Sequence, residues 1–227
     1  MVPRERMTPM ATTAMQMQTT RIDRKNKKRI NEVTPIDKAI KNPSSPLWKA
    51  SVPLEDRVPA AKQGGGIYGI AHTRRATHGG VTESNAHPHI DKDARFFVAH
   101  NGIIENQHKL KQELIAEGYQ FYGETDTEVV PALLAKHWNG NFLETVEKVL
   151  PLLTWSSGFL MMCRDCPGEM IAFKWGSPII LGLNKETHEF FFSSDAQALS
   201  GYAKEIVHLH DGELVHIKNG NYTIKAE

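Results

Sequence analysis

Two short polar segments in the middle of the chain carry side chains that could do chemistry. His72-Thr73-Arg74 follows the apolar run Ile67 to Ala71, and His100-Asn101-Gly102 follows the apolar run Phe96 to Ala99. Both runs are typical of short buried strands, so we expect the polar residues at the strand ends, where side chains can meet in one cleft. The sequence therefore predicts a polar site formed by two loops.

The residues of these loops suit both ends of a small zwitterion. Arg74 offers a planar fork for a carboxylate, and Thr77 and His78 lie near enough in the chain to add hydrogen bonds to the same anion. Asn101 can present its side-chain N–H, and Gly102 tolerates positive φ, so both could donate to a developing oxyanion. An acid in the segment 124–128 could hold an ammonium group. Carboxylate, ammonium and amide oxygen together describe an amino acid such as glutamine.

Four ordered motifs resemble a known family. They are HTRRATHG (His72 to Gly79), NAHPH (Asn85 to His89), HNGIIEN (His100 to Asn106) and ETDTE (Glu124 to Glu128). Together they look like the class II glutamine amidotransferase domain of glutamine–fructose-6-phosphate aminotransferases, from about Gly65 to the C-terminus. Phosphoribosyl-type amidotransferases share the chemistry, but NAHPH and HNGIIEN fit the sugar-phosphate branch better.

The resemblance implies a role for each matching residue. It implies that Arg74, Thr77 and His78 bind the glutamine α-carboxylate and that Asp126 binds the α-ammonium. It also implies that Asn101 and Gly102 form the oxyanion hole, and that the carbonyl of Gly102 can bind the ammonium as well. The implied activity is release of ammonia from L-glutamine for glucosamine 6-phosphate synthesis, without a metal or organic cofactor. The implied fold is α+β, the four-layer αββα sandwich with antiparallel sheets of amino-terminal-nucleophile hydrolases.

Composition excludes several other classes of protein. The formal net charge is +1 over 227 residues, which gives no reason to expect nucleic acid or a membrane surface as partner. The sequence has no apolar run near the ~20 residues that a membrane span needs. Its two cysteines are too few for a disulfide framework and fit a reducing compartment, so we expect a cytoplasmic protein.

The first part of the chain differs in kind from the rest. Residues 1–60 are basic and interrupted by prolines at 3, 9, 35, 43, 46, 53 and 59. We expect a disordered or misassigned leader there, with a targeting peptide or a nucleic-acid-binding tail as weaker alternatives. Residues 61–227 are expected to form the glutamine amidotransferase domain without its first strand.

The resemblance fails at the nucleophile. The family uses an amino-terminal cysteine, whereas this sequence begins Met1-Val2-Pro3. Cys163, at the end of an apolar strand, and Cys166, in a turn, are not expected to substitute, and a metal or redox role for the pair is a minor alternative. Three explanations compete: a misassigned start, which we favour, a binding-only relative, or an unusual nucleophile. The second makes a non-catalytic glutamine-binding or regulatory module the alternative function.

Two further departures concern coupling to the sugar. The family has tryptophan at the position of Arg75, where it closes the ammonia passage, and a charged side chain cannot seal an apolar channel in that way. The family also has sugar-isomerase domains that bind fructose 6-phosphate, and the sequence given contains none. A separate isomerase domain or chain is therefore the partner to expect beside L-glutamine, and homo-oligomerisation stays open.

Periodicity predicts three helices and a set of antiparallel strands after them. The first helix is expected over Gln107–Glu117, with Leu110, Leu114 and Ile115 inward. The second is expected to run to Trp138, with Asp126 or Thr125 as its N-cap, and the third to cover Phe142–Leu153. Pro131 is expected to disturb the second. Strands are expected at Gly158–Cys163, Met170–Trp175, Ile179–Leu183 and Glu189–Ser193, followed by a short helix at Asp195–Tyr202 and hairpins at Asp211-Gly212 and Asn219-Gly220.

The remaining histidines invite a metal hypothesis. His87 and His89 could chelate from an extended segment, and zinc held there would make the protein a metal-dependent hydrolase. Without a carboxylate or cysteine at matching spacing we favour hydrogen-bonded loop histidines instead. His208 and His210 repeat the pattern on what we expect to be an edge strand.

Overall fold

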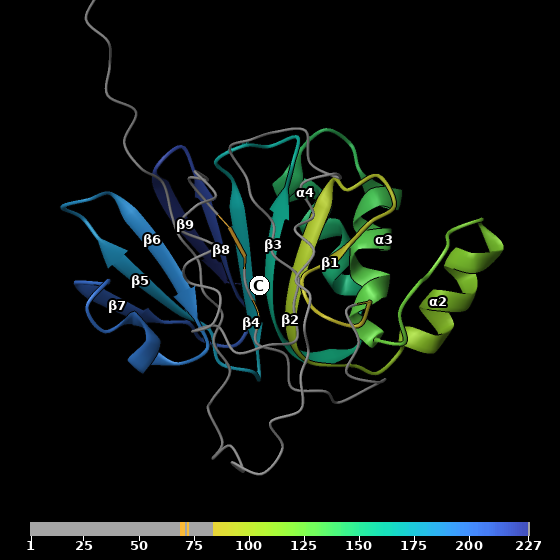
Figure 1. The fold of residues 1–227 in the computed structure, drawn as a ribbon, viewed down its shortest axis with the longest axis horizontal. Helices are drawn as coiled ribbons and strands as arrows, with labels where there is room; N and C mark the ends of the chain where they lie inside the picture. The colour runs from red at the N-terminus through yellow and green to blue at the C-terminus, as the bar shows by residue number, and fades with distance from the viewer. Residues whose placement is uncertain (1–68, 71, 73–83, 227) are drawn as a thin grey trace, which may run out of the picture.

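The computed structural model describes residues 69, 70, 72 and 84–226 (Figure 1). Its strands are β1 (His89–Ile90), β2 (Phe96–Ile104), β3 (Trp155–Cys163), β4 (Met170–Trp175), β5 (Ile180–Asn184), β6 (Glu189–Ser193), β7 (Glu205–His208), β8 (Glu213–Lys218) and β9 (Asn221–Ala226). Its α-helices are α2 (Gln107–Ala116), α3 (Val129–His137) and α4 (Phe142–Val149), and its 3-10 helices are η3 (Asp126–Glu128), η4 (Leu150–Leu152) and η5 (Ala196–Leu199).

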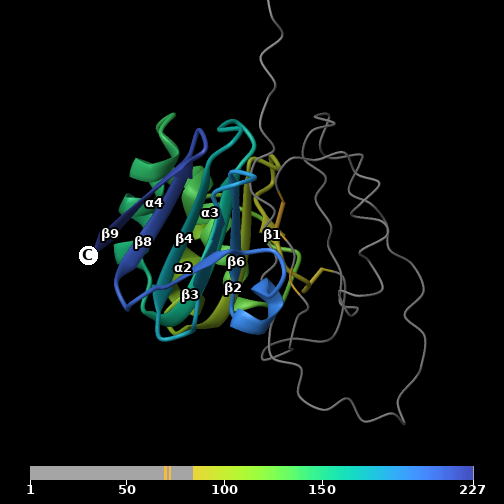
Figure 2. The same ribbon diagram turned by 90° about the vertical axis from the view of Figure 1, so that its left-hand side faces the viewer.

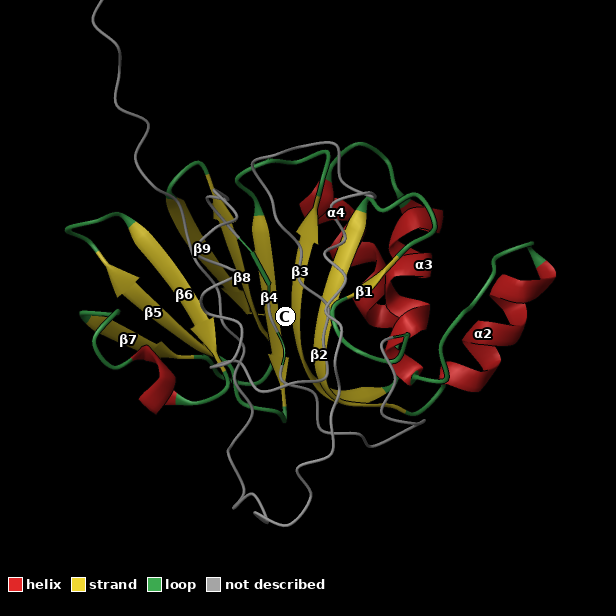
Figure 3. Ribbon diagram, in the orientation of Figure 1, coloured by secondary structure: helices red, strands yellow, loops and turns green. Residues whose placement is uncertain are grey.

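The described elements form three layers. A six-stranded sheet has the order β1-β2-β3-β4-β8-β9, a three-stranded sheet has the order β6-β5-β7, and all their pairings are antiparallel. α3 and α4 lie on one face of the large sheet, with α2 beside α3, and the small sheet lies on the other face (Figures 1 and 2). Figure 3 shows the α-helices grouped apart from the strands, whereas the short helix η5 lies beside the small sheet. The expected α+β sandwich with antiparallel sheets is confirmed, and the described residues supply an α, a β and a second β layer of it.

Alternating side chains of the large sheet fill two separate cores. Phe96, Val98 and Phe159 belong to the cluster beneath the α-helices, whereas Phe97 and Leu160 belong to the cluster between the sheets. This alternation follows from the two-residue period of a strand, and it explains why β2 and β3 are apolar on both faces. The polar residues at one end of β2 are therefore exceptions within a strand that is otherwise buried.

The second of the two polar segments proves to be part of a strand. We expected His100-Asn101-Gly102 after a strand ending at Ala99, but β2 continues to Ile104 and pairs with β3 throughout, with Gly102 opposite Ser157. An Asn-Gly dipeptide commonly marks a turn, yet here β3 provides partners for the whole segment. Of the expected strand Ile67–Ala71, only Gly69 and Ile70 are described.

The helices differ from expectation in detail. Ile115 is 54% exposed, so α2 buries only Leu110 and Leu114, and its predicted inward face was too wide. The second helix divides into η3 and α3, which puts Pro131 in the first turn of α3, where N–H groups have no helical partner and proline is tolerated. The expected third helix ends as an α-helix at Val149 and continues as η4.

The strands of the second half are confirmed apart from one connection. The β8–β9 hairpin turns at Asn219 and Gly220, whose φ values of 52° and 72° suit a two-residue hairpin turn. Asp211-Gly212, by contrast, does not close a hairpin, because β7 pairs with β5 in the small sheet while β8 pairs with β4. The short helix at 195–202 is the 3-10 turn η5, capped by Asp195, whose side chain accepts from Gln197 N.

Two other expectations concern the chain as a whole. The proposed leader, residues 1–60, lies outside the described residues. Among the residues that the structure describes, no helix combines the length and the apolar character needed to cross a membrane.

Candidate active site

The candidate site lies along the outer edge of β2. β1 pairs with β2 only opposite Phe97 and Val98, and beyond Val98 none of the described strands pairs with that edge. Side chains take the place of a partner strand: His100 N donates to His87 Nδ1 at 3.1 Å, and Ile104 N donates to Asp126 Oδ2 at 2.8 Å. Alternate N–H groups of a strand face the same edge, so that of Gly102 lies between these two. Within the described residues it has no side-chain acceptor.

Gly102 is required by its backbone. Its φ of 134° is in a region that side chains rarely adopt, and an added Cβ would lie 2.1 Å from the carbonyl oxygen of Ser156. The absence of a side chain lets β2 and β3 stay paired at this point. A glycine is thus needed for the fold whether or not its N–H contacts a ligand.

Asn101 has a fixed side-chain orientation. Its Oδ1 lies 2.8 Å from Nε2 of His72, and both residues are buried. With the carbonyl oxygen engaged by the imidazole, the amide NH2 group points away from His72. Such an orientation leaves the donor end of the amide for another group, as an oxyanion hole requires.

Asp126 is a buried carboxylate. It is 5% exposed, and its two oxygens accept from Ile104 N and, at 3.3 Å, from Thr127 Oγ1. It does not cap α3, contrary to the alternative role that we considered for it, because η3 precedes that helix and neither N-cap side chain makes a capping bond. No lysine, arginine or histidine of the described chain forms an ion pair with it. Buried carboxylates are usually paired, so Asp126 is suited to receive a cation.

His100 connects the strand to η3 and to β3. Its Nδ1 lies 2.8 Å from Thr127 Oγ1, its Nε2 lies 2.7 Å from Ser157 Oγ, and its ring stacks on Phe159. Burial lowers the pKa of His100 to about 4, although the charge of Asp126 acts in the opposite direction. The imidazole is therefore neutral at pH 7, and it acts as a hydrogen-bonding link instead of a charge.

The other histidines of the site are bonded within the fold. His87 stacks on His72 with ring centroids 4.5 Å apart, and His89 Nε2 lies 2.8 Å from Thr125 Oγ1. These contacts favour the hydrogen-bonded reading of His87 and His89 over the zinc hypothesis. The described residues contain no group of three or more histidine, cysteine or acidic side chains arranged to hold a metal ion.

The segment leading into Asp126 is held by two polar side chains. Asn85 Oδ1 accepts from Glu124 N at 2.8 Å, and Glu128 accepts from the backbone N–H groups of Tyr122 and Gly123. Lys111 lies 3.9 Å from the Glu128 carboxylate. The chain before η3 is thereby fixed on both sides, which restricts the position of Asp126.

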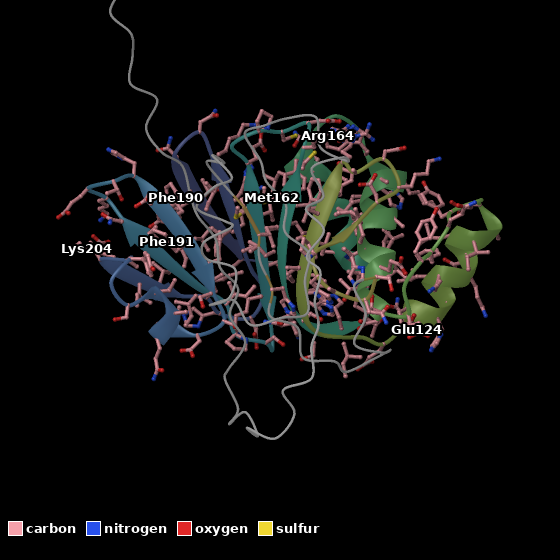
Figure 4. The ribbon with its side chains drawn as sticks, in the orientation of Figure 1. Glu124, Met162, Arg164, Phe190, Phe191 and Lys204 are labelled. Atoms are coloured by element: carbon pink, nitrogen blue, oxygen red, sulfur yellow. The ribbon has the colours of Figure 1, made fainter. Side chains whose placement is uncertain are left out.

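Neither cysteine lies at this site. Cys163 pairs with Phe96, whereas Asn101 pairs with Gly158, ~16 Å further along the strands at 3.3 Å per residue. Burial is the main cause that raises the pKa of both thiols, so neither is a ready thiolate. Figure 4 shows Arg164, next to Cys163, at the top of the view and Glu124, two residues before Asp126, near the bottom.

The structure brings together part of the predicted site. Asn101, Gly102 and Asp126 meet at one edge of β2, whereas Arg74, Thr77 and His78, together with Arg75, lie outside the described residues. Sequence reasoning missed Thr127 and Ser157 as members of the site. Thr127 adjoins Asp126 and could have been suspected, but Ser157 is reached only through the register of β2 and β3.

A family model and curated relatives match most of the described part of the chain. A family model described as "Glutamine amidotransferase domain" matches residues 72–201. A glutamine–fructose-6-phosphate aminotransferase (isomerizing) of Aquifex aeolicus is 47% identical over 146 residues, 64% of this chain and 24% of that protein. One of Fusobacterium nucleatum is 40% identical over 156 residues, 69% of this chain and 25% of that protein. The chain thus spans about a quarter of the length of these relatives.

A solved structure supports the fold. The glutamine phosphoribosylpyrophosphate amidotransferase of B. subtilis, complexed with ADP and GMP, aligns with a TM-score of 0.56 and 23% sequence identity, covering 68% of this chain and 34% of that one. The matched segment includes the site residues on β2 and η3, and the family match extends over more than half of the sequence. This chain therefore belongs to the glutamine amidotransferase domain family.

Proposed function

We propose that this chain binds L-glutamine at the outer edge of β2 and provides the ammonia-releasing part of a glutamine–fructose-6-phosphate aminotransferase. The observation that carries the proposal is the Asp126 carboxylate, which is buried, held by Ile104 N and Thr127 Oγ1, and without a cation among the described residues. A substrate ammonium would supply the missing charge.

The remaining contacts follow from the order of groups along β2. Asn101 and Gly102 precede Ile104, which donates to Asp126, on the same strand, and their N–H groups would donate to the side-chain amide oxygen of glutamine as it becomes an oxyanion. Arg74, Thr77 and His78 would hold the α-carboxylate. Gly102 would also offer its carbonyl to the ammonium. In this arrangement the chain recognises both charged ends of a free amino acid.

The fate of the ammonia defines the wider role that we propose. A sugar-isomerase domain or chain binding fructose 6-phosphate would use it to form glucosamine 6-phosphate, in the cytoplasm. Support comes from the curated relatives, which carry the name of that activity. The residue at position 75 is arginine, and a charged side chain cannot seal an apolar ammonia passage as the tryptophan of the family does.

A non-catalytic glutamine-binding or regulatory module is the second candidate. It is favoured by the positions of Cys163 and Cys166, which are remote from Asn101 and have raised pKa values. A glutaminase assay that measures ammonia separates the two candidates. Ammonia release with glutamine supports the enzyme, whereas binding of glutamine without ammonia release supports the module.

Calorimetric titration with L-glutamine tests the binding itself. We expect Asp126→Asn to weaken glutamine binding by about 30-fold or more, because loss of one partner of a buried charge pair costs at least ~2 kcal/mol. Asp93→Asn, which changes an exposed carboxylate, is the matched control and should leave the affinity unchanged. Arg74→Ala should weaken binding similarly. An Asp126→Asn variant that binds glutamine like the unmodified chain would refute the proposal.

A further inference from the structure

A chain of buried hydrogen bonds joins the two halves of the candidate site. Thr127 Oγ1 lies 3.3 Å from Asp126 Oδ1 and 2.8 Å from His100 Nδ1, and His100 Nε2 lies 2.7 Å from Ser157 Oγ. Thr127 and Ser157 are both 0% exposed. The chain begins at the carboxylate that we assign to the ammonium and ends on β3, directly opposite Gly102.

The protons of this chain can be assigned in one consistent direction. His100 N donates to His87 Nδ1, so a neutral His87 carries its proton on Nε2, which lies 3.5 Å from Thr127 Oγ1. In that direction Ser157 would donate to Nε2 of His100 at 2.7 Å, in preference to the Ile103 carbonyl oxygen at 3.5 Å, and Nδ1–H of His100 would donate to Thr127. The threonine hydroxyl then has its own proton left for Asp126. In this assignment every donor points toward the carboxylate, which would orient it and stabilise its charge.

The same chain restrains the oxyanion donors. His100 is covalently next to Asn101, and its ring is fixed on one side by Thr127 and on the other by Ser157. Ser157 also packs against Gly102, since an added Cβ there would lie 2.8 Å from Ser157 Oγ. A shift of Thr127 would therefore displace Asp126 directly, and it would displace Asn101 and Gly102 through His100.

We propose that Thr127 and His100 are positioning residues that set the distance between the ammonium acceptor Asp126 and the oxyanion donors Asn101 and Gly102. This inference rests on the proposed function and adds to it a determinant of substrate length. A fixed separation favours an amino acid whose amide lies at the distance found in glutamine, and disfavours asparagine, which is shorter by one methylene group. Displacements of about 1 Å are enough to impair such positioning strongly.

The test uses two ligands that differ only at the α-amino group. L-glutamine and glutaramate, which is glutamine without its α-amino group, are titrated calorimetrically into the full chain. Thr127→Val removes the hydroxyl at nearly constant volume, Thr127→Ser keeps it, and Thr145→Val makes the same change at another threonine that is 0% exposed but lies on α4.

The two ligands should respond differently to these substitutions. We expect Thr127→Val to weaken the binding of glutamine about tenfold and the binding of glutaramate less than twofold. The reason is that the lost hydrogen bond acts through the Asp126 carboxylate, which only the ammonium of glutamine engages. Thr127→Ser and Thr145→Val should leave both affinities within about twofold of the unmodified chain. The preference for glutamine over asparagine should narrow in Thr127→Val.

Three results would overturn the inference. One is an equal loss of affinity for both ligands in Thr127→Val, which indicates a merely structural threonine. Another is unchanged glutamine binding in that variant. If Thr127→Val does not fold, Ser157→Ala serves instead and should reduce the glutamine-to-glutaramate affinity ratio about threefold, so an unchanged ratio there is the third. Failure of the unmodified chain to bind glutamine would overturn the proposed function itself, which the other results leave intact.

Discussion

At the scale of single residues, the sequence predicted which polar residues lie on β2 and η3 better than it predicted their local structure. Asn101, Gly102 and Asp126 were singled out from their types and order, and they do meet along one strand edge. Their local structure was less predictable, because Asp126 is not a helix cap and Gly102 lies within a strand. Local patterns cannot show which backbone amide a carboxylate will meet, because that depends on how distant elements pack.

Gly102 gives a direct stability test. We expect Gly102→Ala to lower the free energy of unfolding by about 3 kcal/mol or more, because the methyl group would meet the Ser156 carbonyl and the residue would keep a φ of 134°. Gly140→Ala is the control: its φ is 92°, but an added Cβ meets nothing within 4 Å, so ~1 kcal/mol is expected. Urea denaturation measures both, and equal losses would contradict the close approach of β2 and β3.

His100 should make stability depend on pH. Its pKa is about 4 in the folded chain and near 6.5 when unfolded, so the unfolded state takes up a proton first as pH falls. Stability present above pH 6.5 is therefore lost between pH 6.5 and 4, by up to ~3 kcal/mol. The groups that face His100 are Asp126, which opposes this shift, His72, which adds to it, and His87.

Substitution of His100 isolates its share of that loss. His100→Gln should flatten the fall in unfolding free energy between pH 6.5 and 4, measured by urea denaturation at a series of pH values. His108→Gln, at an exposed position of α2, serves as the control and should keep the steeper profile. A His100→Gln profile as steep as that of the unmodified chain would show that other groups dominate.

At the scale of elements, periodicity located nearly every helix and strand but misjudged their ends and faces. β4 and β6 have their predicted bounds and β5 is shifted by one residue, whereas β3 begins at Trp155 instead of Gly158 and β2 extends from its predicted end at Ala99 to Ile104. Pairing with β3 extends it, and no local pattern in 100–104 signals that pairing. The link at Asp211-Gly212 joins two sheets for a similar reason: turn residues mark a reversal and do not identify the partner strand.

α2 offers a test of the corrected helix face. Leu114 is 0% exposed and Ile115 is 54% exposed, although the sequence predicted both to face inward. Leu114→Ala should cost about 2 to 4 kcal/mol of unfolding free energy, since it removes buried apolar volume, whereas Ile115→Ala should stay within ~0.5 kcal/mol. Thermal and urea denaturation of the two variants decide it. A large loss of unfolding free energy in Ile115→Ala would show that Ile115 faces inward after all.

At the scale of the molecule, the layered fold places the site at one end and the cysteine pair toward the other. The α-helices and the small sheet bury the two faces of the large sheet in separate cores, which leaves the edge of β2 as the place where polar groups can gather. The sequence predicted this fold through its family resemblance, because composition and periodicity alone indicated only an α+β domain. The carboxylate pocket of Arg74, Thr77 and His78 stays a prediction.

Titration of the 15N-labelled chain with L-glutamine, followed by the amide signals in NMR spectra, tests the central claim most directly. We expect the amide signals of Gly102 and Ile104 to shift with saturation, since one N–H faces the ligand and the other donates to Asp126, while those of Gly140 and Gly168, in turns away from the site, stay in place. Absence of any shift at millimolar glutamine, or shifts confined to residues away from β2 and η3, would contradict it.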